Sequence, residues 1–128
     1  RYTNPLLDLP RDTDAGKIIE VQNYLASGRL ADPVLKYAIR LCEATRVHPL
    51  VELGISPRGV AALVKMARAN AVLRERNYVV PEDVQNVFLD VCAHRLILRP
   101  QARVDGLTAR EVLEEALTNV RPPRPEDR

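Results

Sequence analysis

The stretch that determines the fold runs from Ile55 to Val84 and reads ISPRGVAALVKMARANAVLRERNYVVPEDV. Ser56 followed by Pro57 is a typical helix start, because a serine oxygen caps free backbone amides and proline fits the first helical position. Arg58 then falls in the first turn, at the positive end of the helix dipole, where a cation costs about 0.3–1 kcal/mol. Free amides, dipole and guanidinium together favour a phosphate. The sequence therefore indicates an anion site at Arg58; the alternative is a solvated arginine that tolerates the penalty.

The helix that begins at Pro57 is predicted to continue to about residue 74. Its apolar residues occupy two faces, which predicts a central helix packed by several neighbours. The first face holds Val60, Leu63, Val64, Ala67 and Ala71, and the second holds Ala62, Met66, Ala69 and Leu73. Residues 77–80 are β-prone and form an extended connector or a tiny strand. Pro81 opens the next helix, with Glu82 and Asp83 complementing its positive end.

Periodicity and helix breakers predict the other elements. The expected helices besides 57–74 are 13–26, 32–46, 81–92 and 109–120. The last begins with a capping box, in which Thr108 caps and Glu111 follows three residues later. Residues 94–98 are a second β-prone piece that could pair with 78–80, and 47–54 and 99–106 are expected loops. The prediction is an all-α bundle of about five helices with at most one tiny β pair. Its organisation is a linker at 1–11, one helical domain at 12–120 and a Pro-rich disordered tail at 121–128.

Composition limits the functions open to the chain. The 128 residues suffice for one domain with a modest core, which must be aliphatic because there is one Phe and no Trp. Nineteen basic against 17 acidic residues give a net charge of +2, too balanced to indicate nucleic acid or an anionic membrane as a partner. No apolar run is long enough to span a bilayer. Cys42 and Cys92 fall inside predicted helices and indicate buried, reduced thiols of a cytoplasmic protein, with a disulfide as the alternative.

No residue pattern in the chain indicates that it performs a reaction by itself. The Gly16-Lys17 pair continues into Ile18 and lacks the glycines and hydroxyl of a phosphate loop. His48 and His94 have no cysteines or carboxylates at ligand spacing, so no metal site is predicted. We therefore expect no catalytic residue within the chain.

Two further arginines, Arg46 and Arg95, are candidate anion ligands. Arg46 falls in the last turn of the helix 32–46, where a cation suits the dipole, and Arg95 follows the helix 81–92 and is placed in the same way. Only Arg58 has a local position that calls for an outside partner.

Five pieces of the chain together resemble the C-terminal lid of the MoxR family of AAA+ ATPases. They are 44–46 (ATR), 54–58 (GISPR), 76–84 (RNYVVPEDV), 94–96 (HRL) and 106–108 (GLT). Their order and spacing follow the family, and the resemblance covers roughly residues 15–120. Val80 departs from the family pattern, which often has Thr or Ser before this proline, and the departure is expected to weaken the start of the following helix.

The resemblance implies a function that the composition does not. In such ATPases, ATP and Mg²⁺ lie between a large α/β core and the helical lid, and the core carries the phosphate loop. The lid supplies a sensor arginine aimed at the γ-phosphate, and Arg58 matches it, with Ser56, Pro57 and Gly59 supporting the helix start. The core is absent from this chain, so no ATP hydrolysis and no tight nucleotide binding are expected of it alone. The implied partners are the core of the same polypeptide and neighbouring subunits of a ring, in a chaperone-like ATPase that matures protein complexes.

Two other function classes compete with this interpretation. An autonomous helical protein-interaction module would have a large exposed apolar groove and no role for Arg58. A helix-turn-helix DNA binder is disfavoured by the balanced charge and by the lack of a basic recognition helix.

Overall fold

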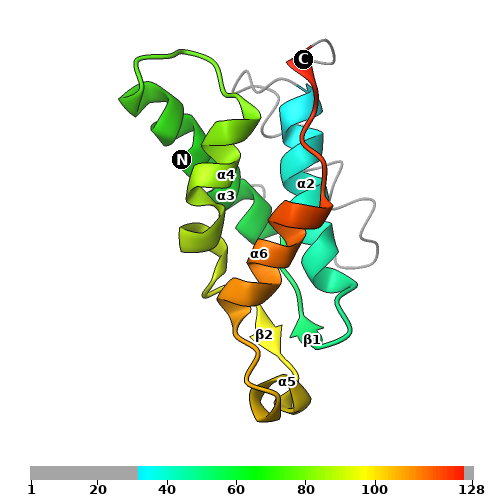
Figure 1. Ribbon diagram of the computed structural model, residues 1–128. Coiled ribbons are helices and arrows are strands. Elements are labelled where there is room, and N and C mark those ends of the chain that lie inside the picture. Colours follow the sequence, from blue (N-terminus) through cyan, green and yellow to red (C-terminus); the bar gives the residue numbers. More distant parts are fainter. Residues whose placement is uncertain (1–31, 126–128) are drawn as a thin grey trace.

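The computed structural model describes residues 32–125, so the predicted linker 1–11 and helix 13–26 lie outside the described residues. Four helices form a bundle: α2 (Asp32–Arg46), α3 (Pro57–Leu73), α4 (Pro81–Cys92) and α6 (Ala109–Asn119). Three short elements lie at one end of it: β1 (Val51–Leu53), β2 (Ile97–Leu98) and α5 (Pro100–Val104). Figure 1 shows this end at the bottom, with α3 and α4 beside each other and α2 beside α6. The predicted helical bundle with one tiny β pair is confirmed.

The core is aliphatic, as the composition predicts, with Tyr37 and Phe88 as its two largest fully buried side chains. The first predicted face of α3 is buried against the bundle. The second face is not covered as expected, because Met66 is 47% and Leu73 82% exposed. Among the described residues, helix α3 therefore buries one side against the bundle, while Met66 and Leu73 on its second face are exposed.

The predicted strand pairing is wrong. Residues 94–98 do supply a strand, but β2 pairs antiparallel with β1, with Val51 opposite Leu98. The segment 78–80 cannot pair, because side chains occupy its backbone groups. Arg76 donates to the Tyr78 carbonyl over 3.0 Å, and the Val80 amide donates to Asp83 over 2.8 Å.

The two expected loops also contain regular structure. Residues 47–54 include β1, and residues 99–106 include α5. Arg99 precedes α5 and donates its amide to the Leu50 carbonyl over 2.9 Å, extending the pairing of the two strands. Pro100 then starts a single helical turn. Both elements are too short for hydrophobic periodicity to reveal.

The predicted capping box of α6 is confirmed. Thr108 Oγ1 accepts from the Glu111 amide over 3.2 Å, and Glu111 Oε1 accepts from the Thr108 amide over 2.9 Å. Beyond α6, residues 121–125 run back beside α2 (Figure 1). The guanidinium of Arg40 donates to the Arg121 carbonyl there over 3.3 Å.

Asp83 joins the end of α3 to the start of α4. Its buried carboxylate accepts two hydrogen bonds from Arg76, at 2.7 and 2.8 Å, one from Asn70 of α3 at 2.7 Å, and one from the Val80 amide at 2.8 Å. Burial raises the pKa of Asp83, but the bonds from Arg76, Val80 and Asn70 outweigh burial and hold that pKa below its usual value. Asp83 thus binds the Val80 amide directly before α4, although Val80 has no side-chain oxygen with which to cap the helix.

Candidate anion site at the start of helix α3

Ser56 and Pro57 form the helix start that the sequence predicts. Ser56 has an extended backbone, and its Oγ accepts from the Gly59 amide over 3.3 Å. The Val60 amide donates to the Ser56 carbonyl over 3.0 Å, and Pro57 has no amide hydrogen. In this first turn, the amide of Arg58 is the one left to face a ligand. The sequence predicts several free amides here, but the structure leaves one, so the guanidinium has to supply most of the attraction for an anion.

Arg58 projects from this turn with an exposed side chain. It makes no hydrogen bond or ion pair with any residue between 32 and 125. No acidic residue occupies the first turn of α3 to offset its charge. A cation at the positive end of the helix dipole without an internal partner is suited to an external anion.

The end of α2 fixes the position of this helix start. The buried Thr45 donates its hydroxyl to the Cys42 carbonyl over 2.6 Å and accepts from the Ile55 amide over 3.1 Å. Beside it, a Cβ at Gly54 would lie 2.8 Å from the Cα of Arg46, so only glycine allows this close approach. The residue directly before Ser56 is thus held by the last turn of α2.

Gly59 permits an equally close contact inside the site. A Cβ at this position would lie 2.5 Å from Ile55 Cγ2 and 3.5 Å from Arg95 Cδ. The aliphatic stem of Arg95 therefore passes beside the first turn of α3. Arg46 lies at the same turn, where it lines a pocket with Pro57. Arg46, Arg58 and Arg95 thus lie around one helix start, although they come from α2, from α3 and from the connection between α4 and β2.

Replacing Gly59 with alanine is expected to lower the free energy of unfolding by about 1–3 kcal/mol. The new methyl group would clash with the fully buried Ile55, and this cost exceeds the gain of up to about 1 kcal/mol from better helix propensity. Urea unfolding followed by circular dichroism measures the change. Lys65→Ala, at an exposed position of α3, is the control and should change the value by less than about 0.5 kcal/mol. A stability gain in Gly59→Ala would show that Ile55 moves aside freely.

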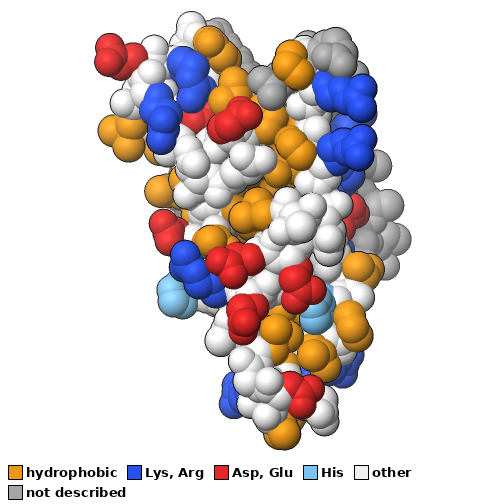
Figure 2. Space-filling model, in the orientation of Figure 1, with side chains coloured by type: hydrophobic (Ala, Val, Ile, Leu, Met, Phe, Trp, Pro, Cys, Tyr) orange, Lys and Arg blue, Asp and Glu red, His pale blue; other side chains and the backbone are white. Residues whose placement is uncertain are grey.

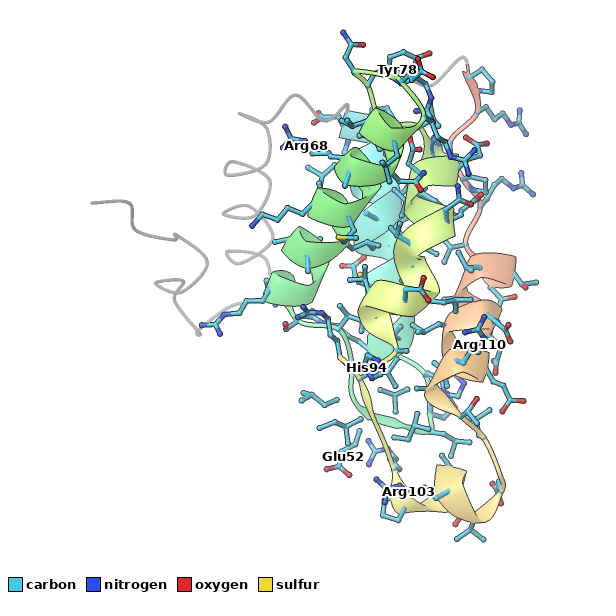
Figure 3. All side chains as sticks on the ribbon, turned by 90° about the vertical axis from the view of Figure 1, so that its left-hand side faces the viewer. Glu52, Arg68, Tyr78, His94, Arg103 and Arg110 are labelled. Carbon is cyan, nitrogen blue, oxygen red and sulfur yellow. The ribbon has the colours of Figure 1, made fainter. Side chains whose placement is uncertain are left out.

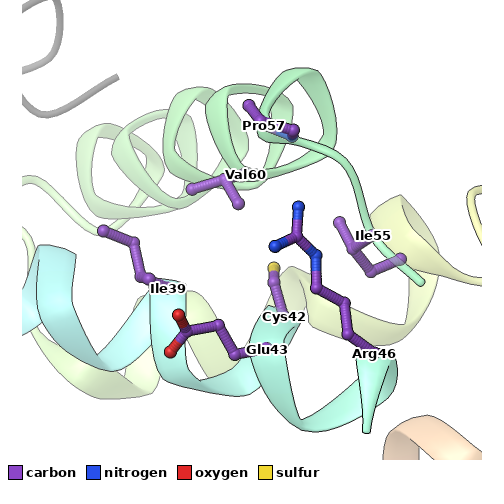
Figure 4. Close-up of a pocket in the computed structure, with 7 residues that line it drawn as sticks. All are labelled: Ile39, Cys42, Glu43, Arg46, Ile55, Pro57 and Val60. Atoms are coloured by element: carbon purple, nitrogen blue, oxygen red, sulfur yellow. The ribbon is translucent and has the colours of Figure 1, made fainter. Parts of the chain in front are cut away.

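The pocket beside the helix start is small. Its volume is about 20 Å³, and its lining residues are Ile39, Cys42, Glu43, Arg46, Ile55, Pro57 and Val60. In Figure 4 the guanidinium of Arg46 reaches across it toward Pro57 and Val60. One water molecule would fill this space, so this pocket is not the large apolar groove that an interaction module requires.

The two thiols behind the pocket are structural. Cys42 and Cys92 are free and buried, as the sequence predicts. A hydrogen bond with Cys92, reinforced by burial, raises the pKa of Cys42 well above its usual value. A thiol with a raised pKa has little thiolate and is a poor nucleophile.

The remaining titratable groups of the described chain do not form a reactive site. His48 accepts from the Leu50 amide over 3.1 Å and lies 3.4 Å from Glu115, and His94 lies elsewhere, below the end of α4 in Figure 3. Among residues 32–125, no three His, Cys, Asp or Glu side chains converge as metal ligands would. The exposed guanidinium of Arg58 at the start of α3 is chemically suited to an anion.

Thr45 and Asp83 are the residues whose roles sequence reasoning missed. A threonine in the last turn of a helix is unremarkable by propensity, and only its burial shows that its hydroxyl joins two helices. For Asp83, position in the first turn predicted the helix dipole as its partner, but not the buried bonds to Arg76 and Asn70. The sequence did contain a signal for this contact, because Arg76 is a cation seven residues before Asp83 in the same RNYVVPEDV segment.

Comparison with known proteins supplies the context of this site. The model of the AAA lid domain family matches residues 43–116. The uncharacterized protein YeaC of Bacillus subtilis is 39% identical over 104 residues, which are 81% of this chain and 31% of that protein. Chaperone MoxR1 of Mycobacterium tuberculosis is 31% identical over 118 residues, covering 85% of this chain and 31% of MoxR1.

A solved structure shares the fold. It is a crystal structure of a protein from Cytophaga hutchinsonii assigned as an ATPase, with a TM-score of 0.69 and 30% sequence identity. The match covers 74% of this chain and 32% of that one. The chain therefore spans about a third of the length of these relatives. Among the described residues, no helix has both the length and the apolar character needed to cross a membrane.

Proposed function

Because the chain belongs to the AAA lid domain family and is the C-terminal lid of a MoxR-type AAA+ ATPase, we propose that Arg58 is its nucleotide sensor. The observation that carries the proposal is an exposed guanidinium in the first turn of α3 without a partner among residues 32–125. In this role Arg58 donates charge-assisted hydrogen bonds to the γ-phosphate of ATP held by the core. Ser56, Pro57 and Gly59 fix the helix start from which it reaches out.

The lid contributes position and charge, and the chemistry belongs to the core. None of the described residues near Arg58 forms a set of oxygen ligands for Mg²⁺, so the core holds the metal ion and the hydrolytic water. When the γ-phosphate leaves, Arg58 loses its anionic partner and the lid is free to rotate. The lid thereby reports to the rest of the molecule whether ATP or ADP is bound.

This mechanism places the lid in a larger assembly. Its proposed partners are the core of the same polypeptide and the neighbouring subunits of a ring, which would be reoriented by lid rotation. We also propose a chaperone role, which the relative named Chaperone MoxR1 supports, and its task in maturing protein complexes is what the family resemblance implies. The free, buried thiols of Cys42 and Cys92 support a cytoplasmic location.

Nucleotide binding by the full-length ATPase tests the sensor directly. In Arg58→Ala, the affinity for a non-hydrolysable ATP analogue is expected to fall about tenfold, because a hydrogen bond to a charged group contributes about 1.5–3 kcal/mol. The affinity for ADP should change by less than about twofold, since ADP has no γ-phosphate. Isothermal titration calorimetry measures both values.

A second arginine-to-alanine variant shows whether the effect is specific to Arg58 or follows from the loss of any positive charge on α3. Arg68 is a second exposed arginine of α3, on its outer side (Figure 3). Arg68→Ala should leave both affinities unchanged. Equal weakening of ATP and ADP binding in Arg58→Ala would rule out the γ-phosphate as its partner, and unchanged binding would favour an interaction module that does not use Arg58.

A further inference from the structure

A basic groove lies between α2 and the segment that follows α6. Lys36 and Arg40 of α2 line it together with Arg121 and Arg124, and its volume is about 370 Å³. The remaining lining residues are Pro33, Pro122 and Pro123, so none of the described residues that line the groove is acidic. The bond from Arg40 to the Arg121 carbonyl holds its two walls together. The groove concentrates positive charge on a chain whose net charge is only +2.

Helix α6 carries the opposite charge. Glu111, Glu114 and Glu115 line a second groove of about 350 Å³. Glu114 is 55% exposed and lies 3.8 Å from Arg110, and Glu115 is 51% exposed and lies 3.4 Å from His48. Exposed pairs at these distances contribute little, so both carboxylates can still attract cations from another molecule.

Both charged patches lie on one face of the molecule. Figure 2 shows the basic side chains over α2 and the C-terminal segment at the upper right, and the acidic side chains of α6 lower on the same face. Apolar side chains lie between the two patches, where α4 adjoins α6. Val87 of α4, Leu117 of α6 and Val120, which directly follows α6, are half-buried apolar residues packed against the core. The face thus has a basic corner over α2 and the C-terminal segment and an acidic cluster on α6, with apolar side chains between them, and it also carries charged side chains of both signs over α3 and α4.

We propose that this face binds a second copy of the chain, as an antiparallel dimer with two-fold symmetry. Rotation by a half-turn places the basic groove of each copy against the three glutamates of the other, with the apolar middles in contact. A two-fold axis makes every contact twice, so two modest electrostatic contacts and one apolar contact act together. The second copy is the occupant that the structure favours, because one face of this chain carries both halves of a complementary pair.

Charge reversal across the interface is the test. Arg40→Glu places an acidic residue opposite the glutamates of the other copy, and Glu114→Lys places a cation opposite the basic groove. Each variant alone is expected to dimerise at least about tenfold more weakly than the unmodified chain. An equimolar mixture of the two should form a 1:1 heterodimer, because both contacts then join opposite charges.

Sedimentation velocity at about 100 µM chain and low salt, near 20 mM, measures these species, and about 500 mM salt should dissociate them. Arg103→Glu is the matched control, since Arg103 is an exposed arginine at the sheet end of the molecule (Figure 3). It should leave dimerisation unchanged, and circular dichroism should show that all variants are folded. A chain that remains monomeric at low salt overturns the proposal, even if it captures a labelled polyglutamate peptide. Two variants that fail to pair, or assemblies larger than a dimer, overturn it as well.

Discussion

Hydrolysis of ATP by the full-length ATPase is expected to slow at least about tenfold when Arg58 is replaced by alanine, which corresponds to about 1.4 kcal/mol of transition-state stabilisation. Negative charge on the transferred phosphoryl group must be stabilised in the transition state, and arginines that contact this group are effective there. We propose this contact for Arg58, which projects from the capped start of α3 and makes no ion pair with another described residue. Steady-state phosphate release at saturating ATP measures the effect.

Two further variants test whether the slower hydrolysis of Arg58→Ala comes from the lost contact with the phosphate. Arg58→Lys keeps the charge but not the planar fork of donors, so we expect a rate between those of wild type and Arg58→Ala. Arg68→Ala should hydrolyse ATP at the wild-type rate. If Arg58→Ala is folded and equally fast, Arg58 is an ordinary surface residue, and the chain is better interpreted as an interaction module.

Replacing Asp83 with alanine is expected to cost about 3 kcal/mol in the free energy of unfolding. The substitution removes a fully buried carboxylate and leaves four donors of Asn70, Arg76 and Val80 without their acceptor. The value lies at the lower end for a broken buried pair, because the Arg76 side chain is 22% exposed and reaches water. Urea unfolding of the chain gives the measurement.

Asp90 offers a matched control on the same helix. Its side chain is exposed, so Asp90→Ala removes the same charge from α4 and should change stability by less than about 0.5 kcal/mol. Equal stabilities of the Asp83 and Asp90 variants would contradict the role assigned to the buried carboxylate.

The pH dependence of stability gives an independent check on Asp83. Because its pKa is lowered in the folded chain, its stabilisation is complete above the unfolded pKa of about 3.9 and is lost as pH falls through the folded pKa. The stability difference between wild type and Asp83→Asn should therefore be constant between about pH 5 and 7 and shrink below about pH 4. A difference that grows on acidification would contradict the lowered pKa.

Sequence reasoning succeeded where the determining contacts are local. Ser56 and Pro57, Pro81, and the pair Thr108 and Glu111 each define a helix start through residues at most three positions apart. Four of the predicted helices were therefore placed almost to the residue. The position of Arg58 in the first turn followed from the same local rule.

The features that were missed depend on partners far apart in the sequence. Strand β1 pairs with β2 across more than forty residues, and nothing in Val51–Leu53 alone distinguishes it from a loop. The segment 78–80 is also β-prone, but its backbone groups form hydrogen bonds with the side chains of Arg76 and Asp83 instead of with a strand. Likewise, Thr45 acts on Ile55 only because the chain turns back there. Propensity cannot decide between such competing partners.

Helix α3 is held at both ends by hydrogen bonds to neighbouring parts of the bundle, so its rotation would act as a lever. Thr45 ties the segment before its first residue to α2, and Asp83 ties its last turns to α4, so a turn of α3 carries both neighbours with it. Seventeen residues give an arm of about 25 Å between Arg58 and the tip of the bundle near Tyr78. A tilt of about 10° at the Arg58 end would then move that tip through about 4 Å. In the proposed sensor mechanism, the length of α3 therefore determines how far the tip of the bundle moves when Arg58 loses its phosphate partner.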